Sequence, residues 1–196
     1  PDAGNIIFTR QQEPLGLGHA VWCARHLIGD EPFAVILADD LILSKTPCLK
    51  QMVSAYSGGN MVAAMDIPRA QTASYGILDI DKKQTANKRL VRAKGLVEKP
   101  APAKAPSTLS IIGRYILQPE IFKMLDKQKP GAGGEIQLTD AINQLLPKQD
   151  VYGFRFEGTR YDCGSLAGFV AANAAFALER KDIAAEVKQQ LRKLCS

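Results

Sequence analysis

Short apolar runs alternate with helical patterns in the first third of the chain. Residues 33–37 and 60–66 are almost continuously apolar, as in strands covered on both faces, and residues 5–9 are predicted to form a further strand. Residues 19–27 and 47–56 repeat their apolar positions at helical spacing. The order strand, helix, strand, helix, strand predicts an α/β fold with a mixed, mainly parallel sheet flanked by helices.

The rest of the chain adds a hairpin and several helices. Residues 75–81 and 89–98 are predicted to form a strand pair, joined by a polar turn over 82–88. Three prolines between 99 and 106 exclude regular structure there. The remaining predicted elements are strands at 108–116 and 151–161 and helices at 119–126, 135–146, 168–177 and 183–194.

Composition and charge narrow the class of protein. A chain of 196 residues fits one large domain better than two, and 46% hydrophobic and 23% charged residues are ordinary for a soluble globular protein. The net charge of +5 is spread without a run of five like charges, so we expect no nucleic-acid partner. Nucleotides or sugar phosphates suit the sign of this charge. No apolar stretch reaches the length of a membrane helix, so we expect no membrane partner.

The cysteines and histidines do not favour a thiolate metal site. The four cysteines stand at positions 23, 48, 163 and 195, and no pair has the C-x-x-C spacing of a zinc or thioredoxin-like site. Two histidines offer little material for a mixed Cys/His site. With no visible signal peptide, the simple interpretation is a reduced, cytoplasmic protein.

Two aspartates follow predicted strands and are candidate metal ligands. Asp39 ends the apolar run at 33–37, and Asp162 ends the run at 151–161. In open α/β sheets the ligand crevice lies at the carboxyl ends of the strands. Two carboxylates meeting there suit a magnesium ion that keeps waters and bridges to phosphate. The alternative is that both aspartates simply cap turns at strand ends.

Two further motifs have both a functional and a structural interpretation. The loop from Gly16 to Ala20 precedes a predicted helix, whose free N–H groups can face an anion or a polar ring, although an ordinary tight turn explains the glycines as well. Glu98 and Lys99, before Pro100, end a predicted strand. The glutamate can accept hydrogen bonds from sugar hydroxyls and the lysine can neutralise a phosphate, but a charged strand end needs no function.

Two glycine-containing motifs are also ambiguous. Gly76, after Tyr75, would let a sugar approach the backbone, or it marks a plain bulge. Gly133-Gly134-Glu135 places a carboxylate at the expected start of a helix, where the helix dipole favours it without any function.

The order of the motifs is more specific than any one of them. The chain contains G-L-G-H-A at 16–20, V-E-K-P at 97–100, G-E-I-Q-L-T-D-A at 134–141 and D-C-G at 162–164. In this order the chain resembles the bacterial UTP–glucose-1-phosphate uridylyltransferases (UDP-glucose pyrophosphorylases), within the sugar-phosphate nucleotidyltransferase family. The resemblance covers nearly the whole chain.

This resemblance implies a fold and a reaction. The fold would be the Rossmann-like nucleotide-diphospho-sugar transferase fold, with residues 1–196 as one nucleotidyltransferase domain, the C-terminal two-thirds of the family fold, and closing helices at about 165–194. The implied enzyme joins UTP to glucose 1-phosphate in the presence of Mg²⁺, giving UDP-glucose and pyrophosphate.

The resemblance also assigns roles to residues. Asp39 and Asp162 would hold Mg²⁺ on the nucleotide phosphates and, with Lys99 at the sugar phosphate, form the catalytic set. Asp40 is secondary, because strand alternation should point it away from the site. The remaining implied contacts are Gln11 and Gly16 with the uracil, Tyr75, Gly76 and Glu98 with the glucose, and Glu135 near the sugar or supporting its pocket.

Departures from the family pattern qualify this assignment. The family opens with a glycine-rich G-x-G-T-R loop that binds the triphosphate, and this chain contains no such segment, so it resembles an N-terminally truncated member with little turnover of its own. Leu166 stands where the family often has a lysine. A member without its opening strand would expose strand edges, which predicts a homo-oligomer. The alternatives are a sugar-nucleotide-binding fragment without turnover and a thymidylyltransferase or cytidylyltransferase of the same family, with a protein-interaction scaffold as a third class.

Overall fold

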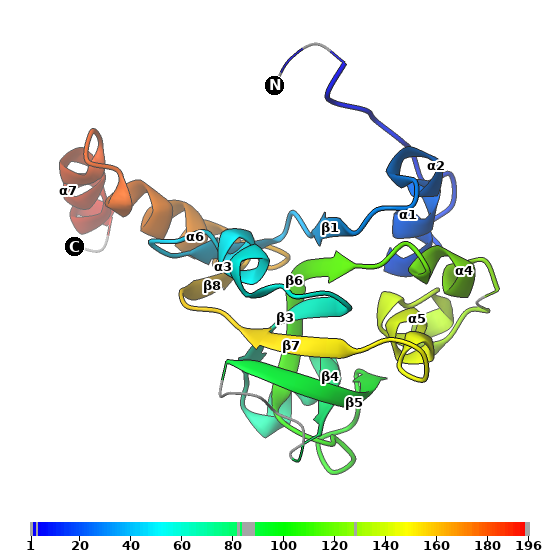
Figure 1. Ribbon diagram of the computed structural model, residues 1–196. Helices are drawn as coiled ribbons and strands as arrows, with labels where there is room; N and C mark the ends of the chain where they lie inside the picture. Colours follow the sequence, from blue (N-terminus) through cyan, green and yellow to red (C-terminus); the bar gives the residue numbers. More distant parts are fainter. Residues whose placement is uncertain (1, 3, 82, 84–88, 128, 195–196) are drawn as a thin grey trace.

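A six-stranded sheet forms the centre of the structure (Figure 1). The computed structural model describes residues 2, 4–81, 83, 89–127 and 129–194. The strand order is β1-β6-β3-β7-β5-β4, with an additional pairing of β4 with β6, and a separate two-stranded sheet pairs β2 with β8. The strands are β1 (Phe33–Ile36), β2 (Asp40–Leu43), β3 (Asn60–Asp66), β4 (Gly76–Ile80), β5 (Leu90–Glu98), β6 (Leu109–Leu117), β7 (Val151–Arg155) and β8 (Thr159–Asp162).

The large sheet is mixed, as predicted, but most of its adjacent strands pair in an antiparallel direction. Strands β1, β3, β7 and β4 run in one direction and β6 and β5 in the other. Among the strand pairs of the described residues, β3 and β7 alone are parallel. The sheet therefore differs from the predicted mainly parallel one, because β6 lies between β1 and β3 and runs antiparallel to both.

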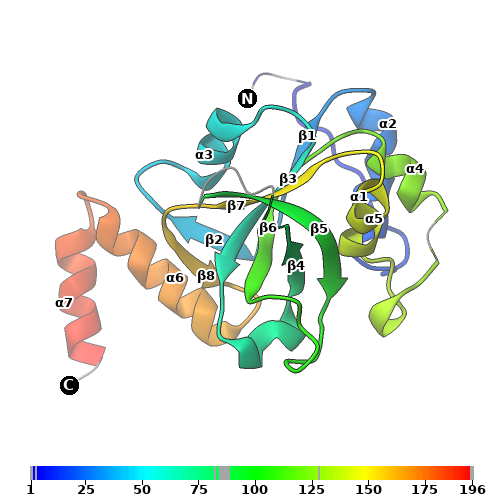
Figure 2. The ribbon, with the colours of Figure 1, turned by 60° about the horizontal axis from the view of Figure 1, so that its bottom comes forward.

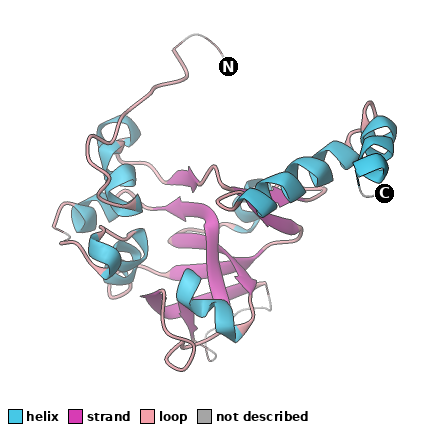
Figure 3. Ribbon diagram, turned by 180° about the vertical axis from the view of Figure 1, so that it is seen from behind, coloured by secondary structure: helices cyan, strands magenta, loops and turns pink. Residues whose placement is uncertain are grey.

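Helices cover the sheet on both faces and extend beyond it. Helices α1 (Leu17–Cys23), α4 (Ile121–Leu125) and α5 (Leu138–Leu145) contact one another, and the short α2 (Arg25–Ile28) follows α1. Helix α3 (Cys48–Ala55) packs against β3 and β6. The C-terminal α6 (Leu166–Glu179) and α7 (Ala184–Leu194) project to one side, as Figures 1 and 2 show, and the view from behind in Figure 3 shows the same arrangement. Two 3₁₀ turns, η1 (Arg69–Ser74) and η2 (Ala132–Gly134), complete the order.

Helix α5 shows how periodicity produces the core. Leu138, Ala141, Ile142 and Leu145 follow the spacing of one helical face, and each is at most 1% exposed. Burying a leucine or isoleucine side chain contributes about 1.5–3 kcal/mol, so this face holds α5 firmly on the sheet. A second apolar cluster, around Met52 of α3, lies between α3 and the sheet.

Several predicted elements are confirmed with small shifts in their ends. Strand β3 has the predicted bounds, α3 differs by one residue at each end, and β4 and β5 form the predicted antiparallel hairpin. Residues 82 and 84–88 of its predicted turn lie outside the described residues. Among the described helices, none is both long and apolar enough to cross a membrane.

Other predictions were wrong. Residues 5–9 form no strand, and Phe8 is 92% exposed. The strand predicted at 151–161 is two strands, β7 and β8, separated at Gly158, whose φ of 138° ends the extended run. Helix α5 begins at Leu138 with Gln137 as its N-cap, so Glu135 does not occupy a helix N-terminus. Strand β2 was not predicted.

Candidate functional site

The antiparallel pairing of β2 with β8 brings Asp39 and Asp162 together. In this pair Asp40 faces Asp162, and the N–H of Cys163 donates to the carbonyl oxygen of Asp39 at 2.7 Å. A Cβ built on Gly164 would lie 3.1 Å from Asp162 Oδ1 and 3.6 Å from Asp39 Oδ2, so both carboxylates reach the same point. The two aspartates converge through this small antiparallel sheet, and not through parallel strands of one sheet as the sequence had suggested.

A polar cavity of about 270 Å³ lies beside these carboxylates. Its lining includes Asp39 and Asp162 together with Tyr75, Gly76 and Glu98, the residues assigned to the sugar by resemblance. The predicted metal ligands and the predicted sugar contacts therefore line the same cavity. These residues come from the loop after β1, from β4, β5 and β8, and from the residue before β4.

Glu98 explains why position 76 is a glycine. Gly76 pairs with Glu98 across the β4–β5 hairpin, and a Cβ at Gly76 would lie 3.1 Å from Glu98 Oε2 and 3.0 Å from Thr139 Oγ1. The Glu98 side chain is only 11% exposed, so its carboxylate is held against the strand. Gly76 is a site of close approach, but protein groups occupy the space where a Cβ would stand, and the predicted approach of a sugar to this backbone stays a prediction.

Four predicted site residues do not line the cavity. Gln11 Nε2 donates to the carbonyl of Gly16 at 3.0 Å, which places these two residues together near the start of α1. The Lys99 Nζ lies 3.9 Å from Glu98 Oε1 with a half-exposed side chain. Glu135 Oε2 accepts a hydrogen bond from Nε2 of Gln137, a residue that does line the cavity, at 3.1 Å.

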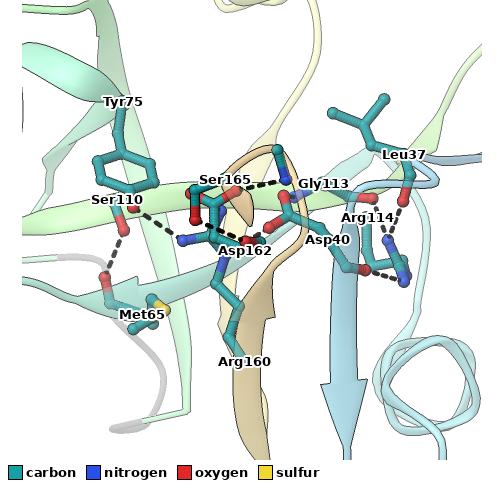
Figure 4. Close-up of polar contacts among 11 residues, drawn as sticks. Leu37, Asp40, Met65, Tyr75, Ser110, Gly113, Arg114, Arg160, Asp162 and Ser165 are labelled. Carbon is teal, nitrogen blue, oxygen red and sulfur yellow. Dashed lines mark hydrogen bonds and ion pairs between the residues drawn. The ribbon is translucent and has the colours of Figure 1, made fainter. Parts of the chain in front are cut away.

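Asp40 lies inside the site, contrary to the prediction from strand alternation. It is 7% exposed and lines the cavity. Its Oδ2 accepts from the N–H of Gly113 at 2.9 Å, and its Oδ1 is ion-paired with Nε of Arg160. The alternation argument failed because Asp40 begins a strand of the small sheet, with its side chain turned toward β6 of the large one (Figure 4).

Two other cavity residues were missed by sequence reasoning. Tyr115 is 5% exposed; burial raises the pKa of its phenol, and the carboxylates of Glu98, Asp40 and Asp39 raise it further, so the phenol is a neutral hydrogen-bond donor. Arg160 stands two residues before Asp162 on β8. Because side chains at i and i+2 share a face of a strand, that spacing was a signal that could have identified Arg160.

The site offers few protein ligands for a metal ion. Within the described part of the chain, no group of three or more His, Cys, Asp or Glu residues could hold a metal. Asp39 and Asp162 therefore form a two-carboxylate set. Such a set fits Mg²⁺, which keeps several waters and is usually held by one or two carboxylates plus substrate phosphates.

The mixed sheet and the carboxylates gathered at a polar cavity are consistent with an α/β enzyme that handles phosphorylated substrates, and the comparisons with known proteins define the class. Residues 3–179 match the sequence model of the nucleotidyl transferase family, and the chain belongs to this family.

The similar proteins are more specific than the family. The UTP–glucose-1-phosphate uridylyltransferase of Bacillus subtilis (strain 168) is 47% identical over 181 residues, which cover 91% of this chain and 61% of that protein. The protein of the same name from Komagataeibacter xylinus is 51% identical over 164 residues, 83% of this chain and 57% of the relative. This chain thus spans about three-fifths of the length of these relatives.

Solved structures give the same result. A UDP-glucose pyrophosphorylase complexed with UDP-glucose superposes with a TM-score of 0.81 at 41% identity, covering 87% of this chain and 65% of the other. A UTP-bound UGPase from Acinetobacter baumannii has a TM-score of 0.81 at 37% identity, covering 93% and 63%. The resemblance drawn from the motif order is confirmed.

Proposed function

We propose that this chain carries the cation-binding and sugar-binding parts of an enzyme that forms UDP-glucose and pyrophosphate from UTP and glucose 1-phosphate. The observation that carries the proposal is that Asp39, Asp162, Tyr75, Gly76 and Glu98 line one cavity. The names of the relatives support the choice of substrates, as do two similar structures, one complexed with UDP-glucose and the other bound to UTP.

The reaction brings two anions together. An oxygen of the sugar phosphate attacks the α-phosphorus of UTP, a new P–O bond forms, and the bond to pyrophosphate breaks. No covalent enzyme intermediate is needed, so positioning and charge compensation are the main tasks of the protein. Asp39 and Asp162 would hold a divalent cation, which when bound compensates phosphate charge. The proposed cation is Mg²⁺, because hard carboxylate oxygens suit it.

Glu98 and Tyr75 are the proposed contacts to glucose, with Gly76 beside them. The nearly buried Glu98 carboxylate can accept hydrogen bonds from sugar hydroxyls, and Tyr75 can offer its ring. Glu135 would support this pocket through its hydrogen bond with Gln137.

Lys99 is the proposed contact to the phosphate of the sugar. Its φ of 45° is, among the described non-glycine residues, the single positive value. A left-handed backbone is costly for a lysine and is often kept at functional sites. This conformation is stabilised by the hydrogen bond from the N–H of Lys99 to the carbonyl of Tyr75 at 3.0 Å. The bond connects the proposed phosphate contact, Lys99, to the proposed sugar contact, Tyr75.

Gln11 and Gly16 are the proposed contacts to the uracil. The hydrogen bond between them fixes the Gln11 amide against the loop before α1. Backbone N–H groups near the start of a helix can meet the polar edge of a base.

The proposal predicts that the chain binds UDP-glucose more tightly than UDP when Mg²⁺ is present. Isothermal titration calorimetry with each ligand measures this difference, and release of pyrophosphate from UTP and glucose 1-phosphate measures turnover separately. Binding without turnover would favour the alternative of a sugar-nucleotide-binding fragment. Tighter binding of dTDP-glucose than of UDP-glucose would instead favour a thymidylyltransferase, and equal affinity for UDP and UDP-glucose would contradict the proposal.

Self-association and a cytoplasmic location belong to the same proposal. Strand β1 pairs with β6 alone among the described strands, and Ile36 at its end is 55% exposed, which leaves an edge for a second copy. We expect sedimentation equilibrium to show dimers or larger species, and a purely monomeric chain at micromolar concentration would contradict this.

The thiols of Cys23, Cys48 and Cys163 are free, which supports a reducing compartment.

A further inference from the structure

Arg160 makes three different contacts with one guanidinium group. Its Nε is ion-paired with Asp40 Oδ1, its Nη1 donates to the hydroxyl of Tyr75 at 2.8 Å, and its Nη2 lies 3.4 Å from Asp162 Oδ2 (Figure 4). Its Cζ is also 5.2 Å from the centre of the Tyr75 ring. The side chains of Arg160 and Asp40 are 12% and 10% exposed, so their ion pair lies largely away from water, whereas the Asp162 side chain is 48% exposed.

Asp40 fixes the position of this guanidinium. The Asp40 carboxylate accepts a hydrogen bond from the N–H of Gly113 on β6 at 2.9 Å. The backbone carbonyl oxygen of Asp40 accepts a hydrogen bond from the guanidinium of Arg114. If Arg160 moved away, a buried carboxylate would lose its charged partner, which is costly. Arg160 is therefore anchored on one side by the large sheet and reaches the cavity with its other two nitrogens.

The contact with Tyr75 faces the proposed sugar. Tyr75 and Arg160 both line the cavity, and the N–H of Arg160 is the hydrogen-bond donor to the Tyr75 hydroxyl. Tyr75 itself precedes Gly76 and accepts through its backbone carbonyl from Lys99. A displacement of the Tyr75 ring would therefore alter the wall of the cavity beside Gly76 and Glu98.

We propose that Arg160 is a positioning residue that holds the Tyr75 ring at the sugar end of the cavity and so sets the contribution of glucose to ligand affinity. This inference rests on the proposed function. Arg160 acts through Tyr75, and the planar guanidinium is required because a lysine ammonium cannot address Asp40, Tyr75 and Asp162 from one rigid fork.

The test uses the ratio of the dissociation constant for UDP to that for UDP-glucose, which measures the contribution of the sugar. A loss of folded protein lowers binding of both ligands equally and leaves this ratio unchanged. We expect Arg160→Lys to lower the ratio by about fivefold, the size of one lost hydrogen bond, and Tyr75→Phe to lower it similarly. The double variant should lower it no further, because both changes remove one interaction.

Arg155→Lys is the matched control. Arg155 on β7 forms an ion pair with Asp66 at 3.1 Å and does not line the cavity. The same chemical change there should leave the ratio unaltered. An unchanged ratio in Arg160→Lys, or effects of Arg160→Lys and Tyr75→Phe that multiply in the double variant, would overturn the inference alone. A wild-type chain with equal affinity for UDP and UDP-glucose would overturn the proposed function, and the inference with it.

Discussion

Replacing Asp40 by alanine is expected to lower the free energy of unfolding by about 3–5 kcal/mol, the usual cost of breaking a buried ion pair by removing one partner. The Arg160 guanidinium would remain buried without its carboxylate, and the N–H of Gly113 would lose its acceptor. Burial lowers the pKa of Arg160, but Asp40 and then Tyr75 more than offset this and raise it overall. Urea denaturation followed by circular dichroism at pH 7 measures the change.

A surface aspartate provides the control for this experiment. Asp79 forms an ion pair with Lys94 at 3.4 Å, and its side chain is 35% exposed. Asp79→Ala should change stability by less than about 1 kcal/mol, as exposed pairs do. A second variant, Asp40→Leu combined with Arg160→Met, removes both buried charges and should recover part of the loss. If Asp40→Ala were no more destabilising than Asp79→Ala, the buried carboxylate of Asp40 and its contacts with Arg160 and Gly113 would not stabilise the fold.

Local patterns identified the elements whose own residues decide their structure. Strand β3 is almost wholly apolar between a glycine pair and Asp66, and α5 places its apolar residues on one face, so both were recognisable in the sequence. Strand β2 has only four residues, and its partner β8 lies more than a hundred positions away. No local signal specifies such a pairing, because the hydrogen bonds that define it come from the distant strand.

In the site, the sequence identified several residues correctly but not how the chain brings them together. Asp39 and Asp162 were predicted together from the residues that follow apolar runs, and they do meet, but through the antiparallel β2–β8 pair. Strand alternation then misplaced Asp40, because the rule was applied to the wrong strand. The spacing of Arg160 and Asp162 could have placed both on one face of a strand, but the contacts of Arg160 with Asp40 and Tyr75 depend on residues that are far away in the sequence.

Neutralising either of the proposed cation ligands, Asp39 or Asp162, is expected to have the largest effect on ligand binding. At 4 Å two unit charges interact by about 1–4 kcal/mol for effective dielectric constants between 80 and 20, and every 1.4 kcal/mol is a factor of ten. We therefore expect Asp39→Asn or Asp162→Asn to weaken Mn²⁺ binding in the presence of UDP-glucose by about tenfold or more. Electron paramagnetic resonance of free Mn²⁺ measures this affinity. Unchanged affinity in both variants would contradict a shared cation site.

Gly164→Ala tests the same site without removing a charge. The added methyl group would lie 3.1 Å from Asp162 Oδ1 and 3.6 Å from Asp39 Oδ2, in the space between the two carboxylates. Gly164 is exposed and its φ is not in the left-handed region, so we expect stability to change little. We expect Mn²⁺ affinity to fall by about tenfold, because the carboxylates can no longer approach one ion.

Gly95→Ala is the matched control for the added methyl group. Its Cβ would meet Asp79 at 3.4 Å, an ordinary van der Waals contact on β5, and Mn²⁺ affinity should stay at the wild-type value. Equal Mn²⁺ affinity in Gly164→Ala and Gly95→Ala would mean that the cation does not lie between Asp39 and Asp162. Loss of affinity in Gly164→Ala alone would locate the cation between those carboxylates, since this substitution changes the space there and leaves every charge in place.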